Sequence, residues 1–434
     1  MKHFRPTRNV AWGTSVKERM THTVSSSTVS YSVNPNMHYL EAIFSRYKTQ
    51  PVRVKPECEG FVKIALAPRL LHNFIVKAEM KIGGDSIQLD NRIIDLESEW
   101  GMKPGMYRDY MKSVGQRNDL TTWGVDIPSV QLECPQPWYF TKDKSQAVPI
   151  WMDPKVNFTY TYRDDLKHIV RMCVIPEAHR QFKRKEKPLL EEDELVEWAE
   201  IPLDTECLTE LSSKVTIFPD MHAIYGYRTD EEILWWKECG KNRIFNVTEY
   251  LPFRSDNTVQ YGSNAVVNAT TYLPIKKVAY MAENIQCTAK REYSNYTTSS
   301  GPDGESPCQT FSLTIGDIDK ATDEPCSSIS TAWYNFDVSP KAPGYHMVSF
   351  VDNNGPNKLD NDVSLTATDG RVKLTVQIDA TERGDQKDKI DFYLHAYIQV
   401  IRVLEYVLNK TGGWDAKLET KSSKKIEEGK SNGS

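Results

Sequence analysis

The sequence lacks any long uninterrupted run of apolar residues. A transmembrane helix needs about 18 such residues in succession, and no stretch of the 434-residue chain approaches that length. The N-terminus carries Lys2, Arg5 and Arg8 but has no apolar segment of the kind found in secretory signal peptides. We therefore expect a protein that neither spans a bilayer nor is exported.

Closely spaced cysteines are also missing. The eight cysteines are scattered, without a C-x-x-C pair and without a histidine close by in the sequence, so zinc and thiol-redox motifs lose most of their support. An even number of cysteines permits disulfides, but in a chain without an export signal free buried thiols are favoured. The eight are Cys58, Cys134, Cys173, Cys207, Cys239, Cys287, Cys308 and Cys326.

Catalytic and metal-binding motifs are absent as well. The nine histidines show no H-x-H or H-E-x-x-H spacing, and no G-x-S-x-G motif accompanies the one conceivable dyad, Asp220 with His222. The oxygen-rich loop at residues 352–362 offers ligands that calcium prefers, but Gly355 stands at the fourth position rather than the sixth, which favours a solvated turn. We expect no catalytic residues, no metal site and no cofactor.

The chain also has no large surplus of either charge. It contains 54 lysines and arginines against 59 aspartates and glutamates, a formal net charge of -5. Nucleic-acid coat proteins draw their affinity from neutralised phosphates, so we expect no direct specific nucleic-acid binding. The basic run at residues 180–187 precedes six acidic residues between 191 and 200, which favours a charged connector over a phosphate site.

What the sequence does contain is alternation of apolar and polar residues with a period of two, the pattern of half-buried strands. Val76, Ala78, Met80 and Ile82 are expected to share one face of a strand. The same pattern recurs at residues 156–162 and 372–378, and a long strand is expected from 392 to about 403. Turn signals separate these runs, and no β-α-β rhythm appears. The sequence predicts an all-β protein built from antiparallel sandwiches.

Three short helices are expected as insertions between strands. Residues 104–114 begin with a proline and space their apolar residues along one face. Residues 229–240 begin with a capping-box sequence and end at a glycine. Residues 188–199 carry acidic residues in their first turns, where the helix dipole favours them.

The length and the local composition suggest two domains with flexible ends. Residues 1–33 are polar and basic and are expected to form a flexible N-terminal arm. Residues 34–214 and 215–418 would each form one sandwich, because the helical and charged stretch at mid-chain interrupts the strand pattern. Residues 419–434, rich in lysine, glutamate, serine and glycine, are expected to be a disordered tail.

Six N-x-S/T sequons occur, and without an export signal most of them are chance matches. Asn295 lies in a polar run that predicts a loop, so it is the most accessible candidate for glycosylation. The sequons are at Asn157, Asn246, Asn268, Asn295, Asn409 and Asn432.

Several short segments, taken together, resemble one family. Three segments are similar to segments in the first half of that family's proteins: Asn34-Pro35, residues 44–49 and the strand–turn segment at residues 82–87. The strongest likeness is at Pro137-Trp138-Tyr139-Phe140. Residues 392–404, followed by Gly412-Gly413, are similar to its closing strand. The family is that of the double jelly-roll major capsid proteins of nucleocytoplasmic large DNA viruses and their relatives, such as phycodnaviruses and iridoviruses.

The resemblance implies two tandem jelly-roll β-sandwiches and a structural function without enzymatic activity. Its members form homotrimers, so the expected partners are further copies of the chain, first within a pseudo-hexagonal capsomer and then between neighbouring capsomers of an icosahedral shell. It further implies minor capsid proteins as partners and, through the N-terminal arm, contact with an internal membrane. The expected location is the virion capsid, assembled in the host cytoplasm.

One alternative belongs to a different class. Tandem jelly rolls also occur in carbohydrate-binding and glycan-cleaving proteins, and the many tryptophans and tyrosines would suit stacking on sugar rings. Such enzymes carry a cleft with a pair of carboxylates at a workable separation. The sequence shows no such pair and no leader, so the capsid interpretation is preferred.

Overall fold

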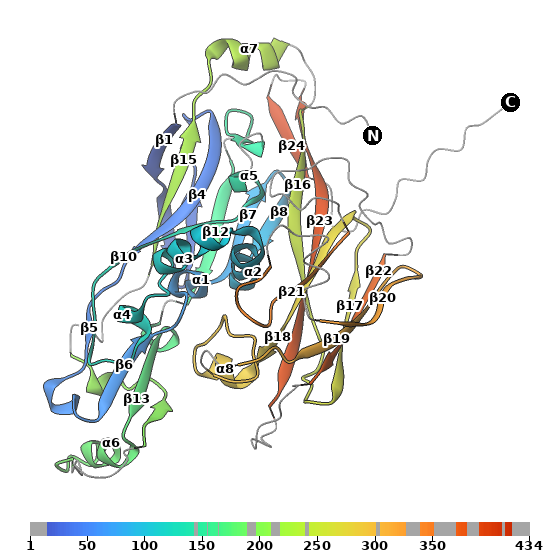
Figure 1. Ribbon diagram of the computed structural model, residues 1–434. Helices are drawn as coiled ribbons and strands as arrows, with labels where there is room; N and C mark the ends of the chain where they lie inside the picture. Colours follow the sequence, from blue (N-terminus) through green and yellow to red (C-terminus); the bar gives the residue numbers. More distant parts are fainter. Residues whose placement is uncertain are drawn as a thin grey trace.

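Two antiparallel β-sandwiches lie side by side, and a smaller lobe projects from the first (Figure 1). The computed structural model describes residues 15–418, apart from 143–145, 154, 164, 189–196, 210–217, 239–242, 301–303, 327–338, 351–369, 380–389 and 410–412. The predicted tail at 419–434 lies outside these residues. In the part of the chain that the structure describes, no helix is both long and apolar enough to cross a bilayer.

The first sandwich consists of two sheets whose strands come from widely separated parts of the chain. One sheet has the order β1 (Ser15–Arg19), β15 (Asp220–Gly226), β4 (Tyr39–Lys48), β10 (Gln131–Pro135). A short fifth strand, β11 (Val148–Pro149), also pairs with β4. The facing sheet has the order β2 (Thr21–Ser25), β3 (Thr28–Ser32), β12 (Asn157–Tyr162), β7 (Ile75–Ile82), β8 (Asp85–Leu89).

The second sandwich repeats this two-sheet plan. Its inner sheet, which faces the first sandwich, has the order β16 (Arg243–Arg254), β23 (Phe392–Leu408), β18 (Ile275–Asn284), β21 (His346–Ser349), with β24 (Trp414–Leu418) also on β23. Its outer sheet has the order β17 (Ser263–Thr270), β22 (Arg371–Ile378), β19 (Cys308–Ile315), β20 (Ile318–Pro325).

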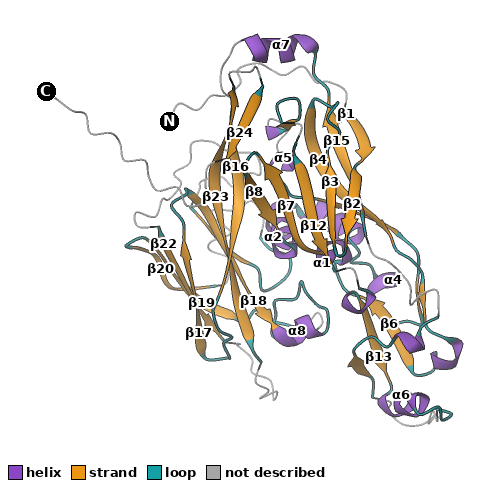
Figure 2. Ribbon diagram, turned by 180° about the vertical axis from the view of Figure 1, so that it is seen from behind, coloured by secondary structure: helices purple, strands orange, loops and turns teal. Residues whose placement is uncertain are grey.

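The projecting part, here called the side lobe, is held by two small sheets. They are β14 (Ala199–Ile201), β13 (Val170–Val174) and β6 (Val62–Leu66), and β5 (Val52–Arg53) with β9 (Asp126–Ile127). The lobe also contains α4 (Asn118–Thr121), α6 (Pro176–Lys183) and two 3₁₀ turns, Pro56–Cys58 and Thr205–Cys207. Both views show it extending away from the second sandwich (Figure 2).

Two of the three predicted helices are confirmed. They are α3 (Pro104–Ser113) and α7 (Asp230–Glu238), the latter at one end of the molecule (Figure 1). Most of the predicted helix at 188–199 lies outside the described residues, and residues 199–201 are strand β14. The described helices outside the side lobe also include α1 (Leu70–Phe74), α2 (Asn91–Gly101), α5 (Tyr139–Lys142) and α8 (Ile285–Ala289).

The helix α2 is not among the three helices expected from the sequence, and it belongs to the core. The Asp90 side chain caps it by accepting a hydrogen bond from the Ile93 amide at 2.9 Å. Ile93, Ile94 and Leu96 are buried, and α2 lies between the two sandwiches (Figure 2). The helix was missed because its buried face also carries polar side chains, which weakens the apolar pattern.

The predicted N-terminal arm is wrong for residues 15–33. Residues 15–32 form β1, β2 and β3, of which β1 pairs with β15 and β3 pairs with β12. Val29 and Tyr31 are 0% and 1% exposed. The serines and threonines of this stretch alternate with apolar residues and occupy the open face of a sheet, so a polar composition concealed a strand.

The predicted domain boundary near residue 214 must move toward the C-terminus. Residue 214 itself lies outside the described residues, but β15 follows it and sits between β1 and β4 of the first sandwich. The first sandwich therefore extends to Gly226, and the second begins with β16. The helix α7 lies in the connection between them.

The alternating strands are confirmed as β7, β12, β22 and β23, with one exception in side-chain direction. Tyr162 pairs with Ile75 whereas Thr161 pairs with Lys77, so Val76 is the extra residue of a bulge. Val76 is consequently 41% exposed while Ile75 is buried. A single-residue bulge shifts the inward face of a strand in a way that alternation alone does not reveal.

Candidate functional site

The inner sheet of the second sandwich is buried on both faces. One face packs on the core of its own sandwich, which includes Val278, Ile398 and Val400. The other face joins the core of the first sandwich, which extends to Tyr397 and Leu404. We call the contact between this sheet and the first sandwich the joint. The joint sets the relative position of the two sandwiches.

A fully buried arginine lies at one end of the joint. Arg402 on β23 donates to the Glu249 carboxylate of β16 at 2.7 Å and to the Ser86 carbonyl at 3.3 Å, and it forms an ion pair with Asp85. The Gln88 amide also donates to Glu249, at 3.2 Å. The arginine thus ties the second sandwich to β8 of the first through charged hydrogen bonds that satisfy its own charge.

The turn between β7 and β8 approaches the second sandwich closely. Gly83 has a positive φ of 57°, as the first residue of a two-residue hairpin turn can require. A β-carbon at Gly83 would collide with the backbone carbonyl of Ala416 on β24, whereas one at Gly84 would meet nothing within 4 Å. The predicted tight turn at Gly83-Gly84-Asp85 is therefore confirmed and also serves as a contact of the joint.

A second ion cluster connects α2 with β18 and β23. The Glu283 carboxylate lies 2.7 Å from the Arg92 guanidinium and 2.6 Å from His395 Nε2. Burial alone would raise the pKa of Glu283, but the hydrogen bond from His395 and the charge of Arg92 outweigh it and lower this pKa to about 2. Burial lowers the pKa of His395, so a neutral ring donates to the ionised carboxylate.

A third cluster lies where α1, α2 and α3 meet the loop before β21. Arg69 donates to Glu99 at 2.6 Å, to Asp95 at 3.2 Å and to the Tyr345 hydroxyl at 3.0 Å. The backbone amide of Lys341, also in the second half, donates to Glu99 at 2.8 Å. All three clusters therefore contain residues of both halves, and the ion pairs of these clusters that span the two halves are Arg402 with Asp85 and Arg92 with Glu283.

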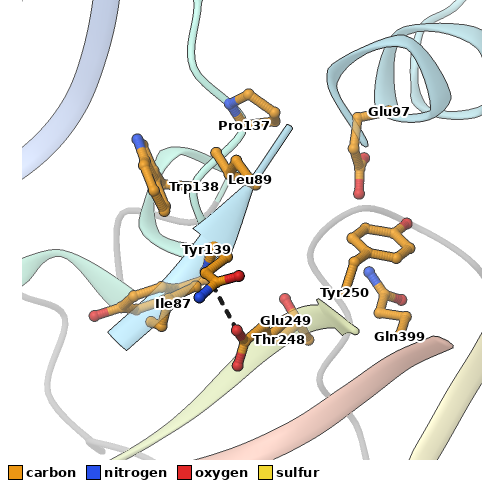
Figure 3. A pocket seen from close by; sticks show the side chains of 11 residues that line it. Ile87, Leu89, Glu97, Pro137, Trp138, Tyr139, Thr248, Glu249, Tyr250 and Gln399 are labelled. Carbon is orange, nitrogen blue, oxygen red and sulfur yellow. Dashed lines mark hydrogen bonds between the residues drawn. The ribbon is translucent and has the colours of Figure 1, made fainter. Parts of the chain in front are cut away.

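A small cavity lies within the joint (Figure 3). Its volume of about 20 Å³ holds one water molecule and excludes a sugar ring. This cavity therefore gives no support to the alternative of a glycan-binding or glycan-cleaving protein. Its lining comes from both halves and includes Ile87, Leu89, Glu97, Trp138, Tyr139, Tyr250 and Gln399.

Comparison with known proteins agrees with this geometry. No protein-family model matches the chain. The major capsid protein of Heliothis virescens ascovirus 3e is 25% identical over 139 residues, so the match spans 31% of this chain and 30% of that relative. A chain of the PBCV-1 virus capsid is similar with a TM-score of 0.64 and 12% identity, covering 95% of this chain and 98% of that one.

Two further solved structures have the same arrangement. The Faustovirus major capsid protein is similar with a TM-score of 0.64 and 8% identity over 93% of this chain and 92% of its own. A chain of the Sputnik virophage is similar with a TM-score of 0.55 and 9% identity over 98% and 92%. The chain has the double jelly-roll fold of viral major capsid proteins. The predicted fold class, all-β with two tandem jelly rolls, is confirmed.

In the double jelly-roll chain, the residues considered for catalysis have structural partners. Asp220 forms an ion pair with Arg19 at 2.5 Å, and the His222 ring stacks on Phe44 at a centroid distance of 5.6 Å. The loop at 352–362 lies outside the described residues. Of the basic run, residues 180–183 belong to α6, where Arg180 pairs with Glu177 at 2.6 Å.

Asn295 lies in a loop, as expected, but its side chain is engaged there. Its amide nitrogen donates to Glu292 at 2.7 Å and to the Ser299 carbonyl at 3.0 Å. Its carbonyl oxygen accepts from the hydroxyl of Thr297, the sequon threonine, which is 6% exposed. The side chain therefore organises the loop, and glycosylation at this position stays a prediction.

The described cysteines are free and buried, which is the state that the sequence favours; Cys239 lies outside the described residues. Folding nevertheless brings Cys207 together with His179 and Asp204 in the side lobe. The sequence alone predicts no metal site, because its cysteines and histidines do not stand close together. Asp204 and Cys207 belong to one turn, whereas His179 comes from α6, and only the fold brings the three side chains together.

Proposed function

We propose that the chain is a major capsid protein, a structural subunit without enzymatic activity in the capsid of a large DNA virus or a relative. The main support is the likeness of both sandwiches together, over 95% of this chain, to a chain of the PBCV-1 virus capsid. The local sequence match to an ascovirus major capsid protein points the same way. In this proposal the protein acts by shape and by contact with copies of itself.

In the proposed assembly, three chains form a closed ring. A homotrimer of chains with two similar sandwiches places six sandwiches around one axis and gives a pseudo-hexagonal block that can tile an icosahedral shell. Such a block requires a constant angle between the two sandwiches of each chain. The ion pairs of Arg402 with Asp85 and of Arg92 with Glu283 support this requirement, because a change of angle would separate these opposite charges.

The remaining partners are neighbouring capsomers and minor capsid proteins, in virions assembled in the host cytoplasm. Contact with an internal membrane was expected through residues 1–33. Since β1, β2 and β3 occupy residues 15–32, that role is now proposed for residues 1–14, which include Lys2, Arg5 and Arg8. Residues 15–33 instead complete the first sandwich, so deleting residues 1–30 is expected to unfold it.

The oligomeric state of the purified full-length chain tests the proposal. Light scattering after size exclusion should give about three times the chain mass of 49.7 kDa, and negative-stain images should show hexagonal particles with a three-fold axis. A variant that lacks residues 1–14 should remain trimeric but assemble shells poorly. A stable monomer at micromolar concentration would rule out the proposed capsomer.

A further inference from the structure

Three segments that are distant in sequence converge in the side lobe. They are the 3₁₀ turn that ends at Cys58, helix α6 with His179, and the 3₁₀ turn that ends at Cys207. The Lys55 amide donates to the Cys207 carbonyl at 2.9 Å, which holds the two turns together. Asp204 caps the second turn through Oδ1, which accepts from the Glu206 amide at 3.1 Å. Its other oxygen, Oδ2, faces the side chains of the cluster.

The side-chain atoms of this cluster lie near the separations that a tetrahedral ion requires, within about 1 Å of them. Bonds of about 2.0 to 2.3 Å from zinc to nitrogen, oxygen and sulfur place neighbouring ligands about 3.3 to 3.8 Å apart. Asp204 Oδ2 lies 3.0 Å from His179 Nε2 and 3.8 Å from Cys207 Sγ, and all three ligand atoms lie within 4.8 Å of one another. The Cys58 thiol neighbours the Cys207 thiol but is not among the three atoms that lie within 4.8 Å of one another, so it would have to move toward the ion to become a fourth ligand.

We propose that Cys58, His179, Asp204 and Cys207 bind one zinc ion in the side lobe. Two sulfur ligands with an imidazole and a carboxylate suit Zn²⁺ better than Mg²⁺ or Ca²⁺, which prefer oxygen alone. Both cysteines are 0% exposed, so the sulfur side of the site is closed, as in structural rather than catalytic zinc sites.

The hydrogen bonds of the cluster show where the ion would fit. His179 Nε2 and the Cys207 thiol each point toward Asp204 Oδ2, and the Cys58 thiol contacts Cys207. One dication can replace the hydrogens in these contacts. Binding releases one proton from each of the two thiols, and the neutral imidazole carries its hydrogen on Nδ1, which leaves the Nε2 lone pair for the metal.

Nearby charges determine the charge balance and the pH dependence. A dication with two thiolates and one carboxylate has a net charge of about -1, and the Lys183 ammonium, 2.6 Å from Asp204 Oδ2, compensates for it. Lys183 also pairs with Glu206 at 2.8 Å, and Lys55 and Glu57 act on Cys58 from its own turn. Thiolate ligands must lose their protons to bind a metal, so affinity for the metal should rise with pH.

Titration of the full-length, reduced and chelator-treated protein with Co²⁺ and then Zn²⁺ tests the site. We expect one equivalent per chain, with thiolate-to-cobalt charge-transfer absorption and the visible bands of tetrahedral Co²⁺, which Zn²⁺ abolishes. Affinity should increase by up to about 100-fold per pH unit, because two thiol protons are released. Zinc should also raise the melting temperature of the wild-type protein.

The matched variants are Cys207→Ser and Cys173→Ser. Cys173, on β13 of the same lobe, is also buried but lies outside the cluster. Cys207→Ser and His179→Gln should lose stoichiometric binding and the zinc-dependent rise in melting temperature, and Cys173→Ser should keep both. Equal binding by Cys207→Ser, absence of binding by folded wild-type protein, or a disulfide between Cys58 and Cys207 in protein purified without oxidant would overturn the proposal. None of these results depends on whether the protein is a trimer.

Discussion

The two sheets of the second sandwich differ in what covers them. In the outer sheet, β22 alternates between exposed and buried residues, with Lys373 exposed and Leu374 buried. In the inner sheet, β23 is buried almost continuously from Phe392 to Val400, because the first sandwich covers its second face. The outer sheet keeps its charges in water, whereas the inner sheet carries buried ones such as Arg402 and Glu249. A strand that loses its alternation and still carries charges therefore marks the place where two domains are joined.

Among substitutions in these two sheets, the largest loss of stability is expected from replacing Arg402, the buried arginine of the inner sheet. Arg402→Met should destabilise the protein by about 3–5 kcal/mol, because it removes the positive charge that neutralises the buried Glu249 carboxylate. Chemical denaturation followed by tryptophan fluorescence measures this loss. The double variant Arg402→Met/Glu249→Leu should recover much of the stability. If the single variant were as stable as the wild type, the joint would not depend on the buried charge of Arg402.

Acid should destabilise the fold by protonating Glu283, which forms an ion pair across the joint. The folded pKa of about 2 lies below the ordinary value of 4.5, so this carboxylate stabilises the fold above about pH 4.5, and its contribution is lost as the pH falls toward 2. The loss should be about 3 kcal/mol. The stability difference between the wild type and Glu283→Gln should therefore shrink by this amount from pH 5 to pH 2. A difference that does not change with pH would contradict the depressed pKa.

The turn at Gly83 and Gly84 allows the stability effects of the same substitution to be compared at two adjacent residues. Gly83→Ala should cost at least about 1–3 kcal/mol, since alanine is strained at a positive φ and its β-carbon would meet the Ala416 carbonyl. Gly84→Ala meets nothing within 4 Å and should change stability far less. Thermal unfolding of the two variants provides the measurement, and equal effects would show that the turn does not contact β24 in solution.

The smallest change in stability is expected from replacing an exposed arginine of the outer sheet. Arg371 on β22 forms an ion pair with Asp317 at 3.2 Å, but the two side chains are 70% and 79% exposed. Arg371→Met should therefore change stability by less than about 0.5 kcal/mol. It is the matched counterpart of Arg402→Met, because both replace an arginine of the second sandwich. If Arg371→Met lowered the free energy of unfolding by more than about 2 kcal/mol, charged residues of the outer sheet would matter for stability as much as those of the inner sheet.

Local pattern was sufficient to predict much of the fold. Alternation identified β7, β12 and β22, and turn residues identified the hairpin at Gly83. The sequence could not reveal the bulge that turns Val76 outward, because the bulge depends on the pairing of β12 with β7. The polar stretch at 15–32 was mistaken for an arm for a related reason: its partners, β15 and β12, lie far away in the chain.

The joint and the candidate metal cluster could not be predicted from the sequence for the same reason. Their residues acquire meaning only from long-range contacts such as Arg92 with Glu283, or His179 with Asp204. No short motif links such pairs. The resemblance to capsid proteins located the turn at residues 82–87, but it gave no indication that this turn contacts β24.

The placement of β1 has a consequence for synthesis on the ribosome. Because β15 lies between β1 and β4, the first described strand to be made finds its partner only when β15 emerges. Arg19 and Asp220, which pair across these two strands, are 201 residues apart. The first sandwich therefore cannot close while the first half of the chain is being translated, and its unpaired edge is open to other nascent chains throughout that time.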